Sequence, residues 1–219
     1  MAVILADVFG SPNIGVYCFC NEKLVVVPPG LTTKKINEFS KALDVDFCKT
    51  TIGGSTLIGA LTAGNSNSIL VPHIIRDYEF DRISKFCKVN VVETNWTALG
   101  NVILSNDFGA VIHPDATEEL RTYVKNELNV QTIDARINNL SFVGSLAVAT
   151  NKGAILSPNT STEEQAAIGE ALHVNVDVST TNGGVSFVKS GIIANSKGAV
   201  VGPLTRGAEL MQITRTLGV

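Results

Sequence analysis

Three ionisable residues stand close together in the stretch "SNDFGAVIHPD", residues 105–115. They are Asp107, His113 and Asp115, with Pro114 between the last two. An imidazole oriented by a carboxylate can act as a general base, and a second carboxylate can assist it. These residue types therefore raise the possibility of an acid–base site.

The cysteines are a second source of chemistry. Cys18 and Cys20 lie two residues apart in a segment expected to be extended, so both face the same side of a strand. A C-x-C pair can bind a metal, but no other Cys or His is close in sequence, and Cys48 and Cys87 are isolated. We interpret all four as buried, reduced thiols, and we expect no metal and no cofactor.

Composition limits the classes of function. The chain has 219 residues, 45% of them hydrophobic and 17% charged, with a net charge of −3, which indicates a compact globular protein. No apolar run reaches the roughly 20 residues of a membrane span, and the N-terminus lacks the basic start of a signal peptide. The charge does not favour binding through phosphates. We expect a cytoplasmic protein with no membrane and no DNA partner.

The opening stretch belongs to a repeat. The segments "NEKLVVVP", "NSNSILVP", "DFGAVIHP", "NKGAILSP" and "SKGAVVGP" end at prolines spaced 42 to 45 residues apart. Seven residues before these prolines stand turn or cap formers, namely Asn21, Asn65, Asp107, Asn151 and Ser196. On this alignment Asp107 lies in a hairpin turn and Asp115 opens a helix, so local structure explains the stretch without catalysis.

Each repeat predicts one supersecondary unit of about 44 residues. An inner strand, led by glycine in four copies, is followed by a polar turn and a second strand that ends at the proline. A helix follows, as in "STEEQAAIGEAL", where Ser161 and Glu164 form a capping box and His173 closes the helix. A third strand completes the unit, for example "VNVVET".

The fifth unit has no third strand of its own. After Pro203 there is room for the helix "RGAELMQITRTL" and nothing more, whereas "AVILADVF" at the N-terminus is a strand without a unit. We predict that this N-terminal strand pairs with the last repeat and closes the ring. The expected fold is a single α/β domain, residues 1–219, forming a five-bladed pseudo-symmetric propeller. The glycine-rich segments 51–56 and 181–186 mark blade junctions.

Several of these segments resemble a known family. The stretches "LIGALTAGNSNSILVP", "ALGNVILSNDFGAVIHPD" and "FVGSLAVATNKGAILSPNTSTEEQ" are similar to translation initiation factor 6 in its archaeal form, and the likeness covers essentially the whole chain. The resemblance implies the pentein fold and a non-enzymatic role. It implies binding to the large (50S) ribosomal subunit, chiefly to the L14-family ribosomal protein near the sarcin–ricin loop. Bound there, the protein would sterically prevent association with the small subunit.

The resemblance has two further implications. Eukaryotic members are linked to biogenesis of the large subunit, and they carry a C-terminal extension that this chain lacks. A mildly acidic protein suits docking on a basic ribosomal protein, because complementary fields aid encounter and specificity. We expect a monomer.

Another class of function remains as an alternative. The pentein fold also hosts guanidine-modifying enzymes, hydrolases or amidinotransferases, which use a Cys nucleophile with His and carboxylates. Their nucleophile lies late in the chain, after a glycine-rich segment. Here all cysteines lie at or before residue 87, and "TNGGVSFVKSG" offers only Ser186 and Ser190. The sequence therefore favours a protein that is not an enzyme.

A ring of repeats brings equivalent loops together on one rim. The residues that follow the strand-leading glycines are Val16, Ala60, Asn101 and Ser145, and we expect them to lie near one another. Our hypothesis is that this rim contributes to ribosome binding; alternatively, Asn101 merely satisfies a turn. Trp96 is open to two interpretations, a core residue at a blade junction or an exposed interface anchor.

Overall fold

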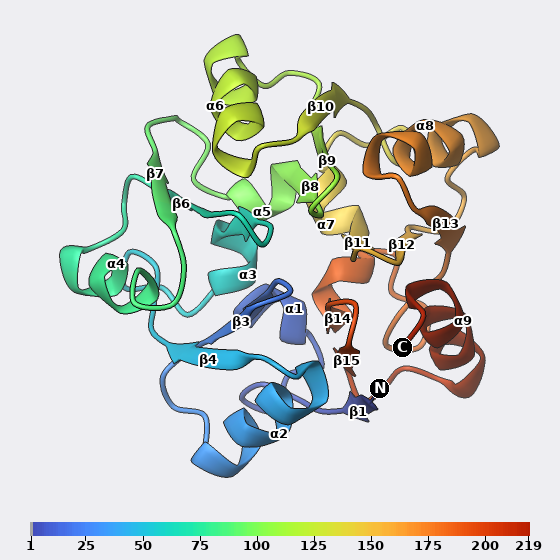
Figure 1. Ribbon diagram of the computed structural model, residues 1–219. Coiled ribbons are helices and arrows are strands. Elements are labelled where there is room, and N and C mark those ends of the chain that lie inside the picture. Colours follow the sequence, from blue (N-terminus) through green and yellow to red (C-terminus); the bar gives the residue numbers. More distant parts are fainter. Residues whose placement is uncertain (1) are drawn as a thin grey trace.

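Five three-stranded sheets form a ring around a central axis (Figure 1). The computed structural model describes residues 2–219. In each sheet the inner strand runs antiparallel to the middle strand, and the outer strand runs parallel to it. The first four blades, inner to outer, are β2 (Phe19–Cys20), β3 (Leu24–Val27) and β4 (Asp46–Lys49); β5 (Ala63–Gly64), β6 (Ile69–Pro72) and β7 (Val89–Val92); β8 (Ile103–Ser105), β9 (Gly109–Ile112) and β10 (Gln131–Asp134); β11 (Ala147–Ala149), β12 (Gly153–Leu156) and β13 (Asn175–Val178).

The fifth blade contains both the earliest and the latest strands of the chain. It consists of β14 (Ile192–Ala194), β15 (Gly198–Val201) and β1 (Ala2–Leu5). β1 pairs in parallel with β15, with Ala2 opposite Gly198 and Leu5 opposite Val201. The predicted pairing of the N-terminal strand with the last repeat is confirmed.

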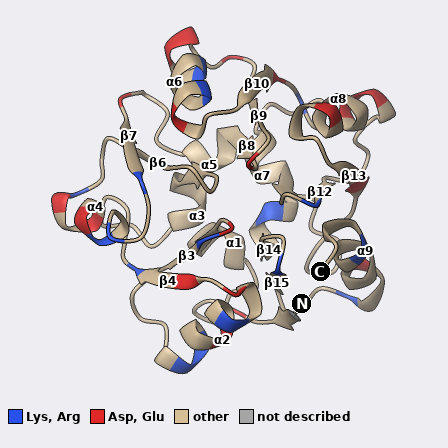
Figure 2. Cartoon of the chain, viewed as in Figure 1, with Lys and Arg blue, Asp and Glu red and all other residues tan. Residues whose placement is uncertain are grey.

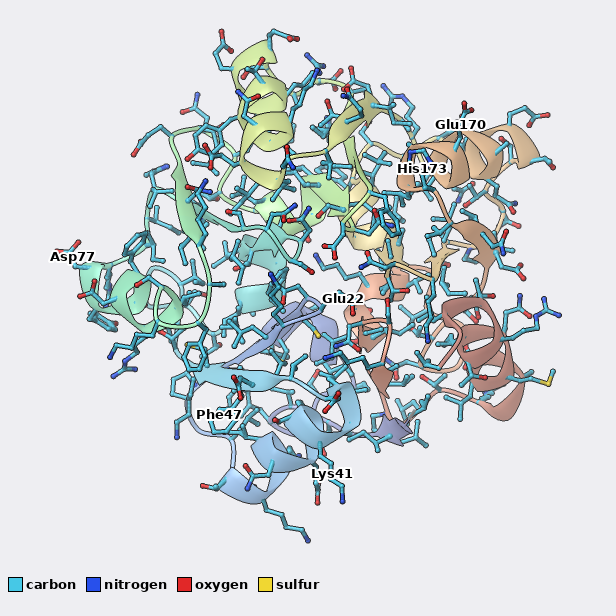
Figure 3. The ribbon with its side chains drawn as sticks, in the orientation of Figure 1. Glu22, Lys41, Phe47, Asp77, Glu170 and His173 are labelled. Carbon is cyan, nitrogen blue, oxygen red and sulfur yellow. The ribbon has the colours of Figure 1, made fainter. Side chains whose placement is uncertain are left out.

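An outer helix follows the middle strand of each blade, and in the first four blades it leads on to the outer strand. These helices are α2 (Thr33–Leu43), α4 (Asp77–Ile83), α6 (Glu118–Leu128), α8 (Thr162–Leu172) and α9 (Gly207–Leu217). The capping box of Ser161 and Glu164 is present, and His173 is the left-handed C-cap of α8. Charged side chains such as Lys41, Asp77 and Glu170 project from the outer helices at the periphery (Figure 3). The predicted helices are confirmed, but α6 begins at Glu118 after the N-cap Thr117, so Asp115 does not open it.

The glycine-led segments predicted as strands begin instead with one helical turn. The turns are α1 (Ile14–Tyr17), α3 (Ile58–Leu61), α5 (Leu99–Val102), α7 (Val143–Leu146) and the 3₁₀ turn η1 (Val188–Gly191), each followed by a short inner strand. A run of four to eight apolar residues has no periodicity that separates a buried helical turn from a buried strand. The sequence pattern therefore located these segments and misassigned their first residues.

Glycine is required in the short helices because they stack closely around the axis. A Cβ atom on Gly59 would lie 2.0 Å from the carbonyl oxygen of Gly15, and one on Gly100 would lie 2.1 Å from that of Gly59. Gly144 approaches the carbonyl oxygen of Gly100 in the same way, at 2.3 Å. Any side chain at these positions would force neighbouring blades apart.

The core lies between adjacent blades and under the outer helices. Both faces of the middle strands are buried, as in β9 and β12, which explains their unbroken apolar sequences. Among residues 2–219, no helix is long and apolar enough to cross a membrane.

Buried asparagines join the blades on the hairpin side of the ring. Asn21, Asn65, Asn106 and Asn195 each start a hairpin turn by accepting backbone N–H bonds at Oδ1. Each Nδ2 then donates to the backbone of the next blade. Asn21 donates to Asn65 O. Asn65 donates to Asn106 O and Leu128 O, and Asn106 donates to Thr150 O and Leu172 O. Asn195 closes the circle by donating to Asn21 O and Leu43 O.

These hydrogen bonds correct the alignment by prolines. In the first two blades the turn-forming Asn stands seven residues before the proline, as predicted, but in the third and fifth it is Asn106 and Asn195. Asp107 and Ser196 are one residue later in the turn. In the fourth blade Thr150 takes this place; its Oγ1 accepts from Lys152 N and Gly153 N, and it has no amide to reach the fifth blade.

Glu22 makes a further link across the seam where the ring closes. Its Oε1 accepts hydrogen bonds from Ser196 N, at 2.9 Å, and from Ser196 Oγ, at 2.8 Å. Figure 3 shows Glu22 near the centre of the ring. The first and fifth blades are thus joined by side chains as well as by the chain that leads from β1 into α1.

We predict that Asn65→Thr destabilises the protein. Threonine can still accept the turn bonds, as Thr150 does, but Asn106 O loses its side-chain donor and Leu128 O keeps only that of Asn67, which costs about 1 to 3 kcal/mol. Urea unfolding would measure the loss. Asn37→Thr, on the exposed face of α2, is the control and should change stability by less than about 0.5 kcal/mol. Equal stability of Asn65→Thr and the parent chain would contradict the interblade role.

Candidate functional site

The structure separates the three residues of the opening stretch. Asp107 joins hairpin turns of three blades: its carboxylate accepts from Ser66 N and Ser66 Oγ, both at 2.7 Å, and from Asn151 Nδ2, also at 2.7 Å. None of these contacts involves His113. The interpretation of Asp107 as a turn residue rather than a member of a triad is therefore correct.

His113 is a packed aromatic residue at the end of a buried strand. Its ring lies 4.6 Å from the Trp96 ring and 5.4 Å from the Phe142 ring, centroid to centroid. The backbone N–H of Asp115 donates to Nδ1 at 3.1 Å, so Nδ1 carries no proton. Burial lowers the pKa of His113 and outweighs the opposing charge of Asp115. This imidazole is a neutral structural group.

The thiols are not activated. Burial raises the pKa of Cys48 and of Cys87 to about 11, and it raises the pKa values of Cys18 and Cys20 further. A nucleophilic cysteine needs a lowered pKa, because the thiolate is the reactive form. In the part of the chain that the structure describes, no group of three or more His, Cys, Asp or Glu residues could hold a metal ion.

The four residues predicted to share a rim do lie together. Val16, Ala60, Asn101 and Ser145 line one pocket of about 220 Å³ at the centre of the ring, on the side where the short helices begin. We call this the rim pocket. Its remaining lining residues are Gly15, Phe187, Lys189 and Ser190. The last three come from the fifth blade, which sequence reasoning missed because that blade lacks the leading glycine.

Asn101 is not needed to complete its turn. Its backbone N–H donates to Ala98 O at 2.9 Å, whereas its side chain makes no hydrogen bond to any residue between 2 and 219. By contrast, Ser145 Oγ donates to Phe142 O at 2.8 Å. The half-buried Asn101 amide therefore has unused hydrogen-bonding capacity among the described residues.

Exposed apolar side chains precede three of the short helices that contribute to the rim pocket. Leu57, Phe142 and Phe187 occupy the same position in their blades, the residue before the short helix, and are 42%, 51% and 49% exposed. Figure 2 shows the charged residues mainly on the outer helices and strands. Within the five short helical turns among the described residues, Lys189 is the one charged residue. The rim is therefore apolar and nearly uncharged, which is typical of the core of a protein interface.

Glutamates from the outer helices hold the junction turns that lead into this rim. Glu79 accepts hydrogen bonds from Gly53 N at 2.6 Å, from Gly54 N at 2.8 Å and from the Thr51 hydroxyl. Gly53 and Gly54 have φ of 61° and 79°, which explains the glycine pair. Glu209 clamps the turn at Gly183 and Gly184 in the same manner, and Glu164 clamps Asn138 and Asn139.

The third junction departs from this plan. The helix position of the clamping glutamate is occupied by Leu120, the third residue of α6, and the junction contains Trp96. The Trp96 ring is half-buried against the core of the third blade and also lines a cleft with His73, Glu93 and Glu119. Trp96 thus combines the two interpretations left open by the sequence, because one part of it packs and another part faces solvent.

Comparison with known proteins identifies the family. The model of the eIF-6 family matches residues 3–216. The chain belongs to the eIF-6 family. It is 36% identical to "Translation initiation factor 6" of Staphylothermus marinus, over 99% of this chain and 98% of that protein. It is 38% identical to the protein of the same name from Methanocaldococcus jannaschii, over the full length of both.

A solved structure with a related arrangement is a DDAH from Pseudomonas aeruginosa in complex with citrulline. It matches with a TM-score of 0.48 and 11% identity, covering 75% of this chain and 68% of that one. Because this member of the eIF-6 family is similar over its whole length to proteins named translation initiation factors, it is a translation factor and not an enzyme.

We predict that Glu79→Gln loosens the second junction turn. Burial raises the pKa of Glu79, but the hydrogen bonds from Thr51, Arg76, Gly54 and Gly53 outweigh it and lower the pKa below 4.5. Replacing the carboxylate by an amide should cost about 2 to 4 kcal/mol at neutral pH, because charge-assisted hydrogen bonds are lost. Thermal unfolding of both proteins would measure the difference.

The pH dependence of that difference provides a second measurement. A carboxyl group with a lowered folded-state pKa stabilises the protein above its unfolded-state pKa, and this contribution is lost as the pH falls through the folded-state pKa. The deficit of Glu79→Gln should therefore shrink below pH 4.5. Glu163→Gln, in the exposed first turn of α8, is the matched control and should show neither effect. A deficit independent of pH would refute a charge-dependent clamp.

Proposed function

We propose that the chain binds the large (50S) ribosomal subunit and sterically prevents its association with the small subunit. Membership of the eIF-6 family, together with a nearly uncharged apolar rim, is the observation that carries this proposal. The partner would be chiefly the L14-family ribosomal protein near the sarcin–ricin loop. The protein would act by occupying the surface of the large subunit to which the small subunit binds, and no covalent bond needs to be made or broken.

The rim supports docking on a protein rather than on RNA phosphates. Exposed Phe142 and Phe187 offer rigid apolar anchors, and aromatic anchors contribute much of the binding free energy at protein interfaces. Phosphate binding would require a cluster of basic residues, whereas the short helices contribute Lys189 alone among the described residues. Asn101, with its uncommitted amide, would supply directional hydrogen bonds at the centre.

Rigidity of the ring would make occupancy effective. The short helices approach each other so closely that the four glycines admit no side chain, and the rim has little room to deform. A preorganised surface loses less conformational entropy on binding than a mobile one.

We further propose that the chain acts in the cytoplasm, as a monomeric single domain, and takes part in large-subunit biogenesis. Met1, part of the predicted domain 1–219, lies outside the described residues.

The test is a sucrose gradient of purified ribosomal subunits with and without the protein. We expect the protein to comigrate with the large subunit and the fraction of joined ribosomes to fall as its concentration rises. Protein remaining at the top of the gradient at micromolar concentration would refute the proposed binding. Comigration without loss of joined ribosomes would refute the steric block while preserving ribosome binding.

A single substitution would test the docking surface. Asn101→Arg places a long cation in the rim pocket and should weaken binding to the large subunit at least about tenfold, the effect of roughly 1.4 kcal/mol. Cosedimentation at increasing protein concentration would measure the apparent Kd. Asn37→Arg, an identical change on α2 away from the rim, should bind normally. Equal binding by both variants would exclude the rim pocket from the interface.

A further inference from the structure

Lys189 breaks the five-fold symmetry at the centre of the ring. In the short helices of the first four blades the second residue is glycine, at positions 15, 59, 100 and 144; in η1 the second residue is Lys189. Its backbone lies against the first blade, since a Cβ on Gly15 would lie 1.9 Å from Lys189 O. The lysine side chain then runs into the centre of the ring.

The Lys189 ammonium has one protein partner. Nζ donates to the carbonyl oxygen of Gly100 at 2.6 Å, and no carboxylate within residues 2–219 forms an ion pair with it. Burial lowers its pKa to about 8, so the group is still mainly charged at pH 7. An ammonium has three N–H donors, so two of them and one positive charge remain uncompensated by the protein.

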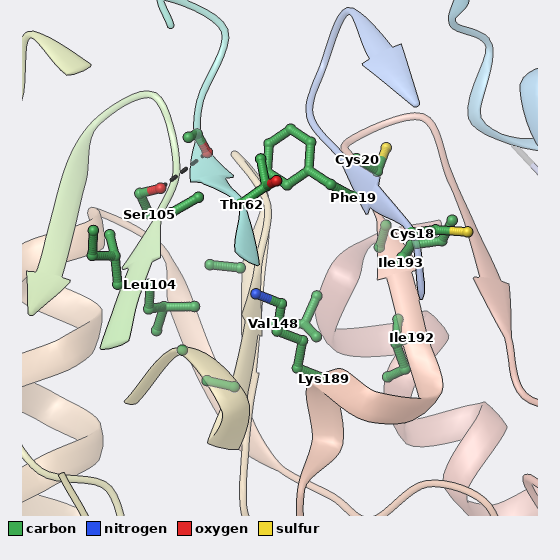
Figure 4. Close-up of a pocket in the computed structure, with 17 residues that line it drawn as sticks. Cys18, Phe19, Cys20, Thr62, Leu104, Ser105, Val148, Lys189, Ile192 and Ile193 are labelled. Carbon is green, nitrogen blue, oxygen red and sulfur yellow. Dashed lines mark hydrogen bonds between the residues drawn. The ribbon is translucent and has the colours of Figure 1, made fainter. Parts of the chain in front are cut away.

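The ammonium faces a cavity of about 70 Å³, which is lined by residues of the inner strands around the axis. Figure 4 shows Lys189 pointing into this cavity and Thr62 on the opposite part of its wall. Thr62 is 1% exposed, and its Oγ1 atom is buried without a hydrogen-bond partner among the described residues. Much of the remaining wall is apolar, for example Leu104, Val148 and Ile192.

The other polar groups of the cavity do not compensate the charge. Ser105 Oγ donates its proton to Gly64 O at 3.0 Å. The thiols of Cys18 and Cys20 are neutral, because burial raises their pKa values. A half-buried lysine and a buried hydroxyl, both with free donors, thus face one small space whose lining is about equally polar and apolar.

We propose that this central cavity is a binding site for a small monovalent anion, a halide such as chloride, held by Lys189 Nζ and Thr62 Oγ1. One negative charge balances the one ammonium, and burial of an unpaired charge is otherwise costly. A spherical ion accepts two donors and tolerates apolar neighbours on its other sides. Phosphate or sulfate would require donors for four oxygens, which the cavity does not offer. The site does not rest on the proposed ribosome binding, although Lys189 also lines the rim pocket.

Diffraction from crystals of the full chain grown in sodium bromide would locate the ion directly. We expect an anomalous bromide peak within hydrogen-bonding range of Lys189 Nζ and Thr62 Oγ1, and its loss in Lys189→Met crystals. Density for water alone, without an anomalous signal at this place, would overturn the proposal. Bromide found only on exposed surfaces would overturn it equally, as adventitious ions.

Thermal unfolding in solution provides an independent measurement. At pH 7 and constant ionic strength, replacing gluconate by chloride at ten times the Kd should raise Tm by about 4 °C, since the ion binds the folded state. Lys189→Met should abolish this rise, and Thr62→Val should reduce it. Lys34→Met, which removes a charge from the exposed face of α2, is the matched control and should retain it. A chloride effect of equal size in Lys189→Met would overturn the site.

The same measurement has a defined pH dependence. The anion needs the charged ammonium, whose pKa is about 8, so the chloride effect should be present at pH 7 and lost above about pH 9. The other titratable groups on the cavity wall are Cys18 and Cys20. The charge of Glu22 raises the pKa of Cys20, and the charge of Lys197 lowers it. The thiols stay protonated across this range. An undiminished effect at pH 9.5 would refute a role for the ammonium.

Discussion

Close backbone contacts run around the axis of this molecule, where the glycines of the short helices meet the carbonyl oxygens of the preceding blade. Gly59, Gly100 and Gly144 leave no room for a Cβ atom, so the blades can approach only where the side chain is absent. This contact fixes the radius of the ring. The radius in turn determines that Val16, Ala60, Asn101 and Ser145 line one pocket rather than four separate loops.

The architecture could be predicted from the sequence because the repeat has a constant length and each unit carries the same order of turn, strand and helix signals. The outer helices and β1 were placed correctly for that reason. Two details could not be predicted. A four-residue helical turn has too short a period to be distinguished from a strand, and the prolines do not mark the same structural position in every blade. Only the hydrogen bonds of Asn106 and Asn195 reveal the true equivalence.

The site was predictable where it repeats and hidden where it does not. Equivalent residues after four glycines were expected together and lie together, but Phe187 and Lys189 come from the blade without that glycine. Trp96 belongs to a junction that has leucine in place of the clamping glutamate. The departures from five-fold symmetry are a cation at the centre, Trp96 at the third junction, and Thr150 in place of a linking asparagine.

The pairing of β1 with β15 also constrains how the chain acquires its fold during synthesis. The strand made first must remain without its sheet partner until β15, near the other end, has left the translating ribosome. Contacts of such large sequence separation form late and slowly. Four blades, each built from consecutive strands, can assemble while translation continues, whereas the fifth blade cannot be completed until β15 has been made. Nascent chains of this protein therefore pass through an open arc that exposes the edge of β1.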